Sequence, residues 1–182
     1  GPLRYHVGMS DPQPLPLPHA PAEFPPRATE FALPGPAGKL ELATATAKPE
    51  DARAGTAIIC HPHPQHGGSL RNKVVTMLER SLRESGLDTV RFNFRGVGES
   101  EGEFDEGDGE SGDLVAVVQW VRGVRPRDAL WLAGFSFGSY VALRTARSLA
   151  ADALITVAPQ VGRWDFAGVA MPECPWLVVQ GE

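Results

Sequence analysis

Apolar and polar positions follow two different periods along this chain. In residues 29–35 and 39–47 they alternate one by one, which predicts two strands of an antiparallel hairpin with its turn at residues 35–38. Residues 55–60 instead form an unbroken apolar run, which is typical of a strand buried on both faces of a sheet. Apolar runs of similar length predict further strands at residues 88–94, 129–133, 152–158 and 175–180.

Helical spacing of apolar positions predicts three helices between these strands. The first spans residues 70–85, with Ser69 as its N-cap and Gly86 as its C-terminal stop. The second is marked by Leu114, Val117, Val118 and Val121 and ends before Pro126, and the third spans residues 137–150. Because strand and helix alternate through most of the chain, we expect an α/β fold. Its sheet is mostly parallel, with an N-terminal antiparallel hairpin and helices on both faces.

The proline content sets the expected start of this domain. Ten of the 17 prolines lie in residues 1–36. Proline lacks a backbone donor and restricts φ, so residues 1–27 are predicted to form an extended arm that cannot join a sheet, and residues 28–182 the domain. The eight residues before Met9 resemble the remnant of a cleaved expression tag, and no signal peptide is recognisable. The alternative for the proline run at residues 12–21 is a ligand for SH3-type domains.

Composition excludes several classes of protein. The 182 residues are 42% hydrophobic and 21% charged, so a sizeable core can be buried. A formal net charge of -5 argues against a nucleic-acid partner, and no run approaches the ~18 apolar residues of a membrane span. Cys60 and Cys174 are too few for a disulfide framework. We therefore expect a cytoplasmic domain without a cofactor, with its oligomeric state left open.

Chemistry in such sheets lies at the carboxyl ends of the strands. One of these junctions reads Gly134-x-Ser136-x-Gly138, between a predicted strand and a predicted helix. Small residues on both sides of the serine permit a sharp turn that exposes its Oγ above a helix N-terminus. Ser136 is therefore the candidate nucleophile, with Gly134 and Gly138 forming the elbow; the alternative is a plain strand-to-helix turn.

The loop at residues 60–73 follows the buried strand at 55–60. In nucleophile elbows of this kind, such a loop supplies one backbone N–H to the oxyanion hole, and the residue after the nucleophile supplies the other. The second donor would be Phe137. For the first we favour His63 with Gln65 as the alternative, because Pro62 and Pro64 have no N–H.

Three histidines in this loop also raise the question of a metal. His61 and His63 share one face of an extended chain and could bind zinc, but no cluster elsewhere in the sequence completes such a site. We predict no metal. The histidines are expected to hydrogen-bond the loop backbone instead.

A third junction, at residues 91–102, follows the next strand. Its Arg95 and Gly96 are predicted to pack beneath the serine elbow. Eight acidic residues follow between positions 99 and 113 and predict a solvated loop, whose last acids favour the N-terminus of the next helix. This loop would also disfavour anionic substrates.

Three segments together resemble the α/β-hydrolase superfamily: HPHPQHGG at residues 61–68, RFNFRGVGESEG at 91–102 and GFSFGS at 134–139. The chain is similar to small bacterial serine hydrolases related to dienelactone hydrolases and carboxylesterases, over roughly residues 29–182. The resemblance implies that Ser136 cleaves a small-molecule carboxylic ester through an acyl-enzyme. It also implies a triad in the order serine, acid, histidine.

The chain departs from this pattern after Ser136, where it contains no histidine. Its downstream acids (Asp152, Asp165, Glu173 and Glu182) do not occupy the expected place of the triad acid. We expect an N-terminal fragment of a longer hydrolase, without the last strand and helix of the fold, that is nearly inactive as given. The alternative is a domain that lacks its base. A histidine of the 61–66 loop is disfavoured as a substitute base, because that loop lies on the oxyanion side.

The segment at residues 159–174 is too short for a helical cap domain, which predicts an open, lidless site. Trp164 and Phe166 would line this site or pack on the core. The sequence thus favours a serine esterase. The alternatives are a non-catalytic binding domain of the same fold and an acyl-transferase or peptidase that uses the same serine.

Overall fold

A computed structural model describes residues 15–160 and 162–181. Within them, seven strands form one sheet in the order β1-β2-β4-β3-β5-β6-β7. The strands are β1 (Thr29–Gly35), β2 (Gly38–Ala45), β3 (Gly55–Cys60), β4 (Asp88–Phe92), β5 (Ala129–Phe135), β6 (Ala153–Val157) and β7 (Trp176–Val179). The helices are α1 (Lys73–Glu84), α2 (Asp108–Val124) and α3 (Phe137–Ala146), with a short 3-10 helix η1 (Pro64–His66).

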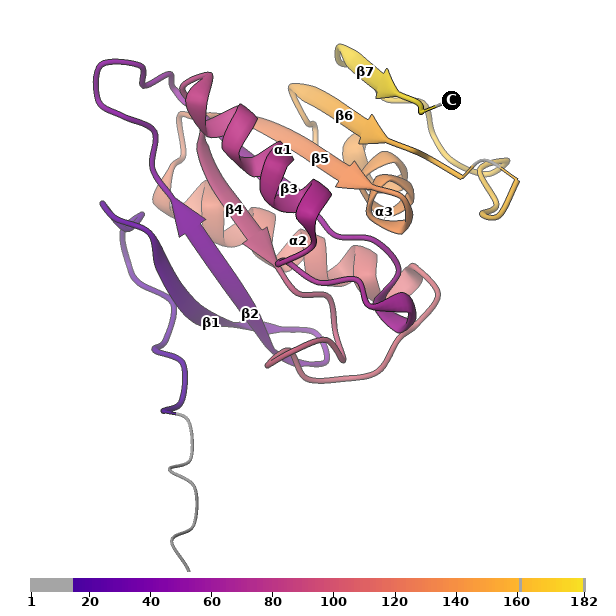
Figure 1. Cartoon of the computed structure of the whole chain (residues 1–182), viewed down its shortest axis with the longest axis horizontal. Helices are drawn as coiled ribbons and strands as arrows, with labels where there is room; N and C mark the ends of the chain where they lie inside the picture. Colours follow the sequence, from indigo (N-terminus) through magenta and orange to yellow (C-terminus); the bar gives the residue numbers. More distant parts are fainter. Residues whose placement is uncertain (1–14, 161, 182) are drawn as a thin grey trace, which may run out of the picture.

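The sheet has the expected mixed topology. β1 and β2 form an antiparallel hairpin closed by Gly35 opposite Gly38, and β2 pairs antiparallel with β4. β4, β3, β5, β6 and β7 are parallel to one another. In Figure 1, α1 covers the near face of the sheet, while α2 and α3 lie behind it. The predicted α/β fold with an antiparallel N-terminal hairpin is confirmed, and the carboxyl ends of β3, β4, β5 and β6 meet at one edge.

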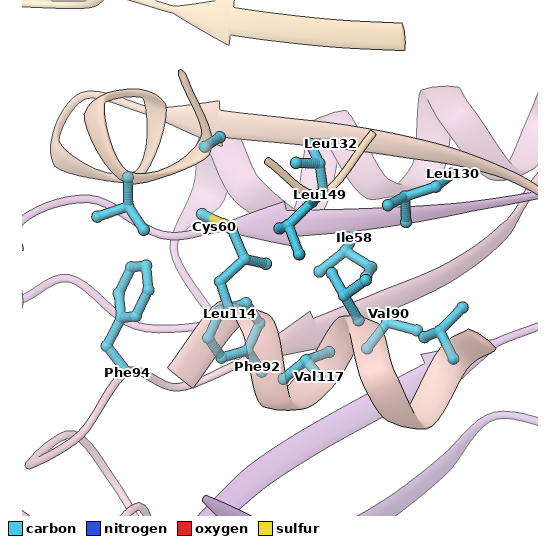
Figure 2. Packing of buried hydrophobic residues seen from close by; sticks show 14 of the residues in the cluster. Ile58, Cys60, Val90, Phe92, Phe94, Leu114, Val117, Leu130, Leu132 and Leu149 are labelled. Atoms are coloured by element: carbon cyan, nitrogen blue, oxygen red, sulfur yellow. The ribbon is translucent and has the colours of Figure 1, made fainter. Parts of the chain in front are cut away.

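Strand β3 is buried along its whole length because both faces of the sheet are covered there. Ala57 and Ile59 pack toward α1, in a small cluster with Val75 and Leu82. The alternate residues of β3, among them Ile58 and Cys60, face a larger core shared with α2 and α3 (Figure 2). The unbroken apolar run at residues 55–60 is therefore explained by two-sided burial.

Helix α1 begins later than predicted, and Asn72 rather than Ser69 is its N-cap. The Asn72 side chain accepts hydrogen bonds from the amides of Val74 (2.9 Å) and Val75 (3.2 Å). The residues before Asn72 are bound to the loop after β4, where Oδ1 of Asn93 accepts a hydrogen bond from the Leu70 amide. This long-range bond removes the first residues from the helix. The predicted stop is confirmed, since Gly86 has a φ of 104° directly after the helix.

Part of the proline-rich arm packs on the domain. The amide of Ala32 in β1 donates to the carbonyl oxygen of Pro18 (2.8 Å), and His19 forms a parallel bridge with Ala32. The expectation that this stretch cannot join a sheet is thus wrong at one point, because proline lacks a donor but keeps an acceptor. Phe24 is buried against Trp120 of α2. The proline run from residue 12 to residue 14 and the proposed tag remnant lie outside the described residues.

Strand β7 lies at the edge of the described sheet. Leu177, Val178 and Val179 are 57%, 45% and 43% exposed, so both faces of this strand meet solvent. Among the described residues, no helix has the length and apolar character needed to cross a membrane.

Candidate active site

Ser136 lies on a tight turn between β5 and α3. Its φ of 54° and ψ of -116° are unusual for a residue with a side chain, and such a backbone conformation costs about 1–3 kcal/mol. Ser136 is the N-cap residue of α3, yet its side chain makes no capping hydrogen bond. The Ser136 amide donates to the carbonyl oxygen of Val157 in β6 (2.9 Å), which ties the turn to the sheet. The elbow expected from the sequence is therefore present, with the serine hydroxyl left free.

The two glycines of the motif are required by close backbone contacts. A Cβ at Gly134 would lie 2.3 Å from the carbonyl carbon of Gly138, and one at Gly138 would lie 2.1 Å from the carbonyl oxygen of Cys60. Real Cβ contacts are never this short. These contacts press the start of α3 against the end of β3, so the loop that begins at His61 lies beside the serine turn.

Two backbone amides at this junction have no partner. Within the described part of the chain, neither the Phe137 amide nor the His63 amide donates a hydrogen bond. The Gln65 amide, the alternative first donor, instead donates to Nδ1 of the His63 ring (3.1 Å). Of the two loop amides weighed from the sequence, only that of His63 is left for an oxyanion.

His61 has a structural role. Its ring is fully buried, Nε2 accepts a hydrogen bond from the Phe94 amide (3.0 Å), and Nδ1 lies 2.7 Å from the Pro62 carbonyl oxygen. Burial lowers the pKa of His61 to about 4, so the ring is neutral and Nδ1 carries the proton. Both nitrogens are thus engaged with backbone, as expected, and His61 cannot ligate a metal in this arrangement.

The His63 ring packs among aromatic side chains at the mouth of the site. Its centroid lies 4.8 Å from that of Phe104, 5.5 Å from Phe137 and 5.6 Å from Trp164. Partial burial, and secondly the charges of His66 and Arg163, lower the pKa of His63 below its ordinary value. The ring is therefore neutral at pH 7.

The loop between β6 and β7 covers part of this cluster. Trp164 stacks on Tyr140 of α3 (5.4 Å, 16°), and Phe166 contacts the same tyrosine edge-on (5.3 Å). Both side chains pack against the main core. Packing on the core is therefore observed for both Trp164 and Phe166, and Trp164 in addition lines the site next to the ring of His63.

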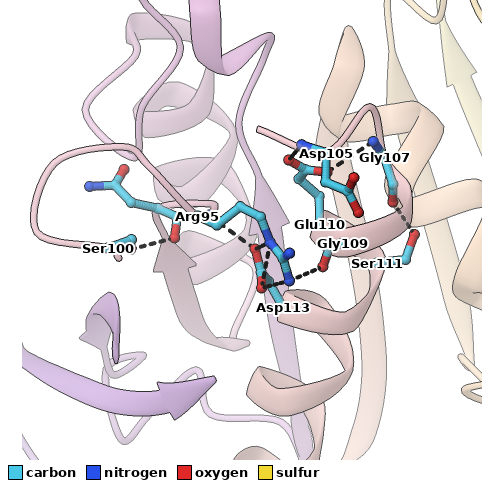
Figure 3. A network of polar contacts seen from close by, with 9 residues as sticks. Arg95, Ser100, Asp105, Gly107, Gly109, Glu110, Ser111 and Asp113 are labelled. Carbon is cyan, nitrogen blue, oxygen red and sulfur yellow. Dashed lines mark hydrogen bonds and ion pairs between the residues drawn. The ribbon is translucent and has the colours of Figure 1, made fainter. Parts of the chain in front are cut away.

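Arg95 does not pack beneath the elbow, and this prediction is wrong. Figure 3 shows its guanidinium bound to α2: Nη2 pairs with Oδ1 of Asp113 (2.9 Å) and donates to the Gly109 carbonyl oxygen (2.8 Å). The Asp113 hydrogen bond raises the pKa of Arg95, so the pair is ionic. Gly96 is exposed beside it. Sheet order decides this outcome, because β4 is separated from β5 by β3.

The acidic segment is only partly solvated. Its first six acids are exposed, but Glu110 and Asp113 are completely buried. Glu110 accepts hydrogen bonds from the amides of Gly107 and Asp105 (both 2.9 Å) and so caps α2, as expected for an acid at a helix N-terminus. The segment thus has an exposed acidic rim, residues 99–108, and two buried carboxylates, Glu110 and Asp113, that fix it to α2.

The downstream acids have local roles. Asp152 precedes β6 at the opposite edge of the sheet and accepts a hydrogen bond from the Leu130 amide (2.8 Å). Glu173 pairs with Arg147 after α3 (3.1 Å), and Asp165 accepts from the Ala167 amide (2.9 Å). Among the described residues, none of the three forms a hydrogen bond or ion pair with a histidine. Glu182 lies outside the described residues.

A mostly parallel sheet with a serine on a strained turn between a strand and a helix defines an α/β serine hydrolase. The family model of the X-Pro dipeptidyl-peptidase (S15 family) matches residues 38–174. The chain belongs to this family of α/β serine hydrolases. The resemblance carried by the three sequence motifs is thereby confirmed.

Two similar solved structures come from bacteria. XC6422 of Xanthomonas campestris, described as an α/β serine hydrolase without lid, is 54% identical with a TM-score of 0.84 over 87% of this chain and 73% of that one. An α/β serine hydrolase homologue of Coxiella burnetii is 49% identical with a TM-score of 0.80, over 84% of this chain and 73% of that one.

The uncharacterized protein RP471 of Rickettsia prowazekii is 34% identical over 153 residues. The chain spans 63% of the length of that Rickettsia relative.

Proposed function

We propose that the protein hydrolyses carboxylic esters of small molecules through a covalent intermediate on Ser136. The observation that carries this proposal is the strained elbow, which leaves the Ser136 hydroxyl free beside two unpaired amides, those of Phe137 and His63. Similarity to a lidless serine hydrolase supports the same reaction. A purely binding domain would not need a backbone held in so costly a conformation.

In the proposed reaction, Ser136 Oγ attacks the ester carbonyl carbon while a base accepts the hydroxyl proton. The carbonyl oxygen becomes an oxyanion, stabilised by the Phe137 and His63 amides and by the N-terminus of α3. The tetrahedral intermediate then breaks down, and the alcohol leaves with the proton that the base accepted. Water hydrolyses the resulting acyl-enzyme, which releases the carboxylic acid and restores the serine hydroxyl. No histidine follows Ser136 in these 182 residues, so we propose that the natural protein supplies the base and the acid beyond Glu182.

The test is an intact-mass spectrum of the natural, uncropped protein with and without a fluorophosphonate. We expect a mass well above 19.5 kDa and one adduct that is lost in Ser136→Ala. The matched control is Ser148→Ala, which alters an exposed serine just after α3 and should keep the adduct. A natural protein of 182 residues that forms no adduct would contradict the esterase proposal and favour a binding domain.

The second candidate function is peptide hydrolysis, favoured by the match to the X-Pro dipeptidyl-peptidase family. The same serine and oxyanion site would serve both reactions. Rates on an Ala-Pro p-nitroanilide and on p-nitrophenyl butyrate, measured with one enzyme preparation, separate them. We expect turnover of the ester only.

A further inference from the structure

The hydrogen bonds of His63 determine which of its ring nitrogens carries the proton. Nδ1 accepts a hydrogen bond from the Gln65 amide at 3.1 Å, so it must hold a lone pair. A neutral imidazole with an accepting Nδ1 carries its proton on Nε2. His63 is therefore a donor at Nε2 and has no free lone pair with which to act as a base.

This Nε2–H is available to a ligand. Among the described residues, no protein atom accepts a hydrogen bond from this Nε2–H. Nε2 is also not among the fully buried side-chain atoms that have no hydrogen-bond partner, so it is exposed to solvent. The ring is held in place by Phe104, Phe137 and Trp164, so little conformational freedom would be lost on binding. The His63 ring lies 5.5 Å from the ring of Phe137, the residue that follows Ser136, which places the donor in the same part of the site.

A cavity with room for a substituent is lined by Phe104, a residue that contacts the His63 ring. This cavity of about 390 Å³ separates Pro64 and Gln65 from Gly102, Glu103 and Phe104. The His63 ring is neutral, and the cavity is bordered by both Glu103 and Arg95, of which Arg95 is already paired with Asp113, so the matching acceptor is a neutral oxygen.

We propose that His63 is a specificity residue whose Nε2–H binds a neutral ether or hydroxyl oxygen of the ester substrate, close to the bond that is cleaved. This inference rests on the proposed ester hydrolysis at Ser136. It makes the His63 side chain a substrate contact, and it separates this role from that of the His63 amide at the oxyanion.

The experiment uses the natural full-length protein and an isosteric pair of substrates, p-nitrophenyl methoxyacetate and p-nitrophenyl butyrate. Ethyl ester pairs with 2-methoxyethyl and butyl alcohol groups test the other side of the scissile bond. His63→Phe keeps the ring packing and removes the donor, whereas His63→Gln keeps a donor near the position of Nε2. His19→Phe is the matched control, since it makes the same substitution at an exposed histidine of the arm.

We expect His63→Phe to lower the preference for the oxygen-containing ester of one pair by about 10-fold through KM, which corresponds to one neutral hydrogen bond. His63→Gln should keep most of that preference, and His19→Phe should keep all of it. Ratios between paired substrates cancel their intrinsic reactivity. ¹⁵N NMR of the wild-type ring should report protonation at Nε2.

Three results would overturn the proposal. One is an unchanged preference in both substrate pairs. The second is a thousandfold loss of kcat on all esters in both variants, which would identify His63 as the base. The third is an Nδ1–H tautomer. Binding of the paired esters to Ser136→Ala, measured without turnover, keeps this inference distinct from the proposed reaction, whose own failure appears as the missing adduct on Ser136.

Discussion

The serine elbow requires glycine at position 138, where a side chain larger than a hydrogen atom has no space. At Gly138 the backbone approaches the carbonyl oxygens of Cys60 and His61, and a methyl group has no space there. Gly123, on the exposed side of α2, has no atom within 4 Å of the place where a Cβ would stand. The two glycines therefore respond to the same substitution in opposite directions.

Gly138→Ala should lower the free energy of unfolding by about 3 kcal/mol, because the added Cβ overlaps backbone that cannot move freely. Gly123→Ala, the control, should raise it by roughly 0.5–1 kcal/mol through the better helix propensity of alanine. Urea unfolding of both variants measures these changes. Equal stability of Gly138→Ala and wild type would show that the close approach is not needed.

His61 links stability to pH. Its pKa is lowered from 6.5 to about 4 by burial, so the unfolded chain binds one proton more than the folded chain between these two values. Stability from this residue is complete above pH 6.5 and is lost as the pH falls toward 4. The loss should total ~3 kcal/mol, at up to about 1.4 kcal/mol per pH unit.

Unfolding free energies of wild type and His61→Gln, measured at pH 7, 6 and 5, test this link. The amide oxygen of glutamine can still accept from the Phe94 amide but does not titrate. The difference between the two proteins should therefore shift in favour of the variant as the pH falls. Parallel pH profiles would contradict the lowered pKa.

At the scale of elements, the proline-rich arm is ordered by its contacts with β1 and α2. Residues 18–24 cover one edge of β1 and the outer side of α2. Phe24 lies 5.8 Å from the ring of Trp120, and the guanidinium of Arg125 lies 4.9 Å from the Phe24 ring. The Trp120 Nε1–H donates to the Pro21 carbonyl oxygen (3.1 Å). The arm thus contributes to the core as well as protecting a strand edge.

Phe24→Ala should destabilise the protein by about 3 kcal/mol, since it empties a buried aromatic position and removes the contact with Arg125. Glu23→Ala, at the exposed neighbouring residue, should change stability by less than about 0.5 kcal/mol. Thermal or urea unfolding serves for both. If Phe24→Ala behaves like the control, the arm is not part of the folded unit.

At the scale of the whole fold, β7 is an edge strand with no further strand beside it among the described residues. Its free backbone groups and the exposed Leu177, Val178 and Val179 offer a template for pairing with another chain. Met77 on α1 is equally exposed, at 60%, but lies on a helix that has no such edge. The two sites therefore allow the effect of an exposed apolar side chain on association to be separated from the effect of an exposed strand edge.

The 182-residue chain should associate with increasing concentration, and Leu177→Lys should reduce this association because a charge on an edge strand opposes pairing. Met77→Lys is the control and should leave association unchanged. Light scattering coupled to size exclusion measures both. A wild-type chain that stays monomeric at all concentrations would contradict the prediction.

The sequence by itself determined the features that rest on local physics. Alternating and unbroken apolar runs predicted the hairpin and the buried strand β3, and Gly134-x-Ser136-x-Gly138 predicted the elbow, because each depends on residues close together in the chain. Helix ends were predicted less well, because Ser69 and Asn72 are both suitable N-caps, and it is Asn72 that accepts from the amides at the start of α1.

Only the tertiary structure decided which distant groups meet. Sheet order placed Arg95 on Asp113 instead of under the elbow, buried two acids of an otherwise exposed segment, and engaged both nitrogens of His61. A local bond, from the Gln65 amide to the His63 ring, sets the ring proton on Nε2, but the sequence did not show that this bond forms. Spacing along the chain cannot reveal the long-range pairs, because they form only when strands separated in sequence lie side by side.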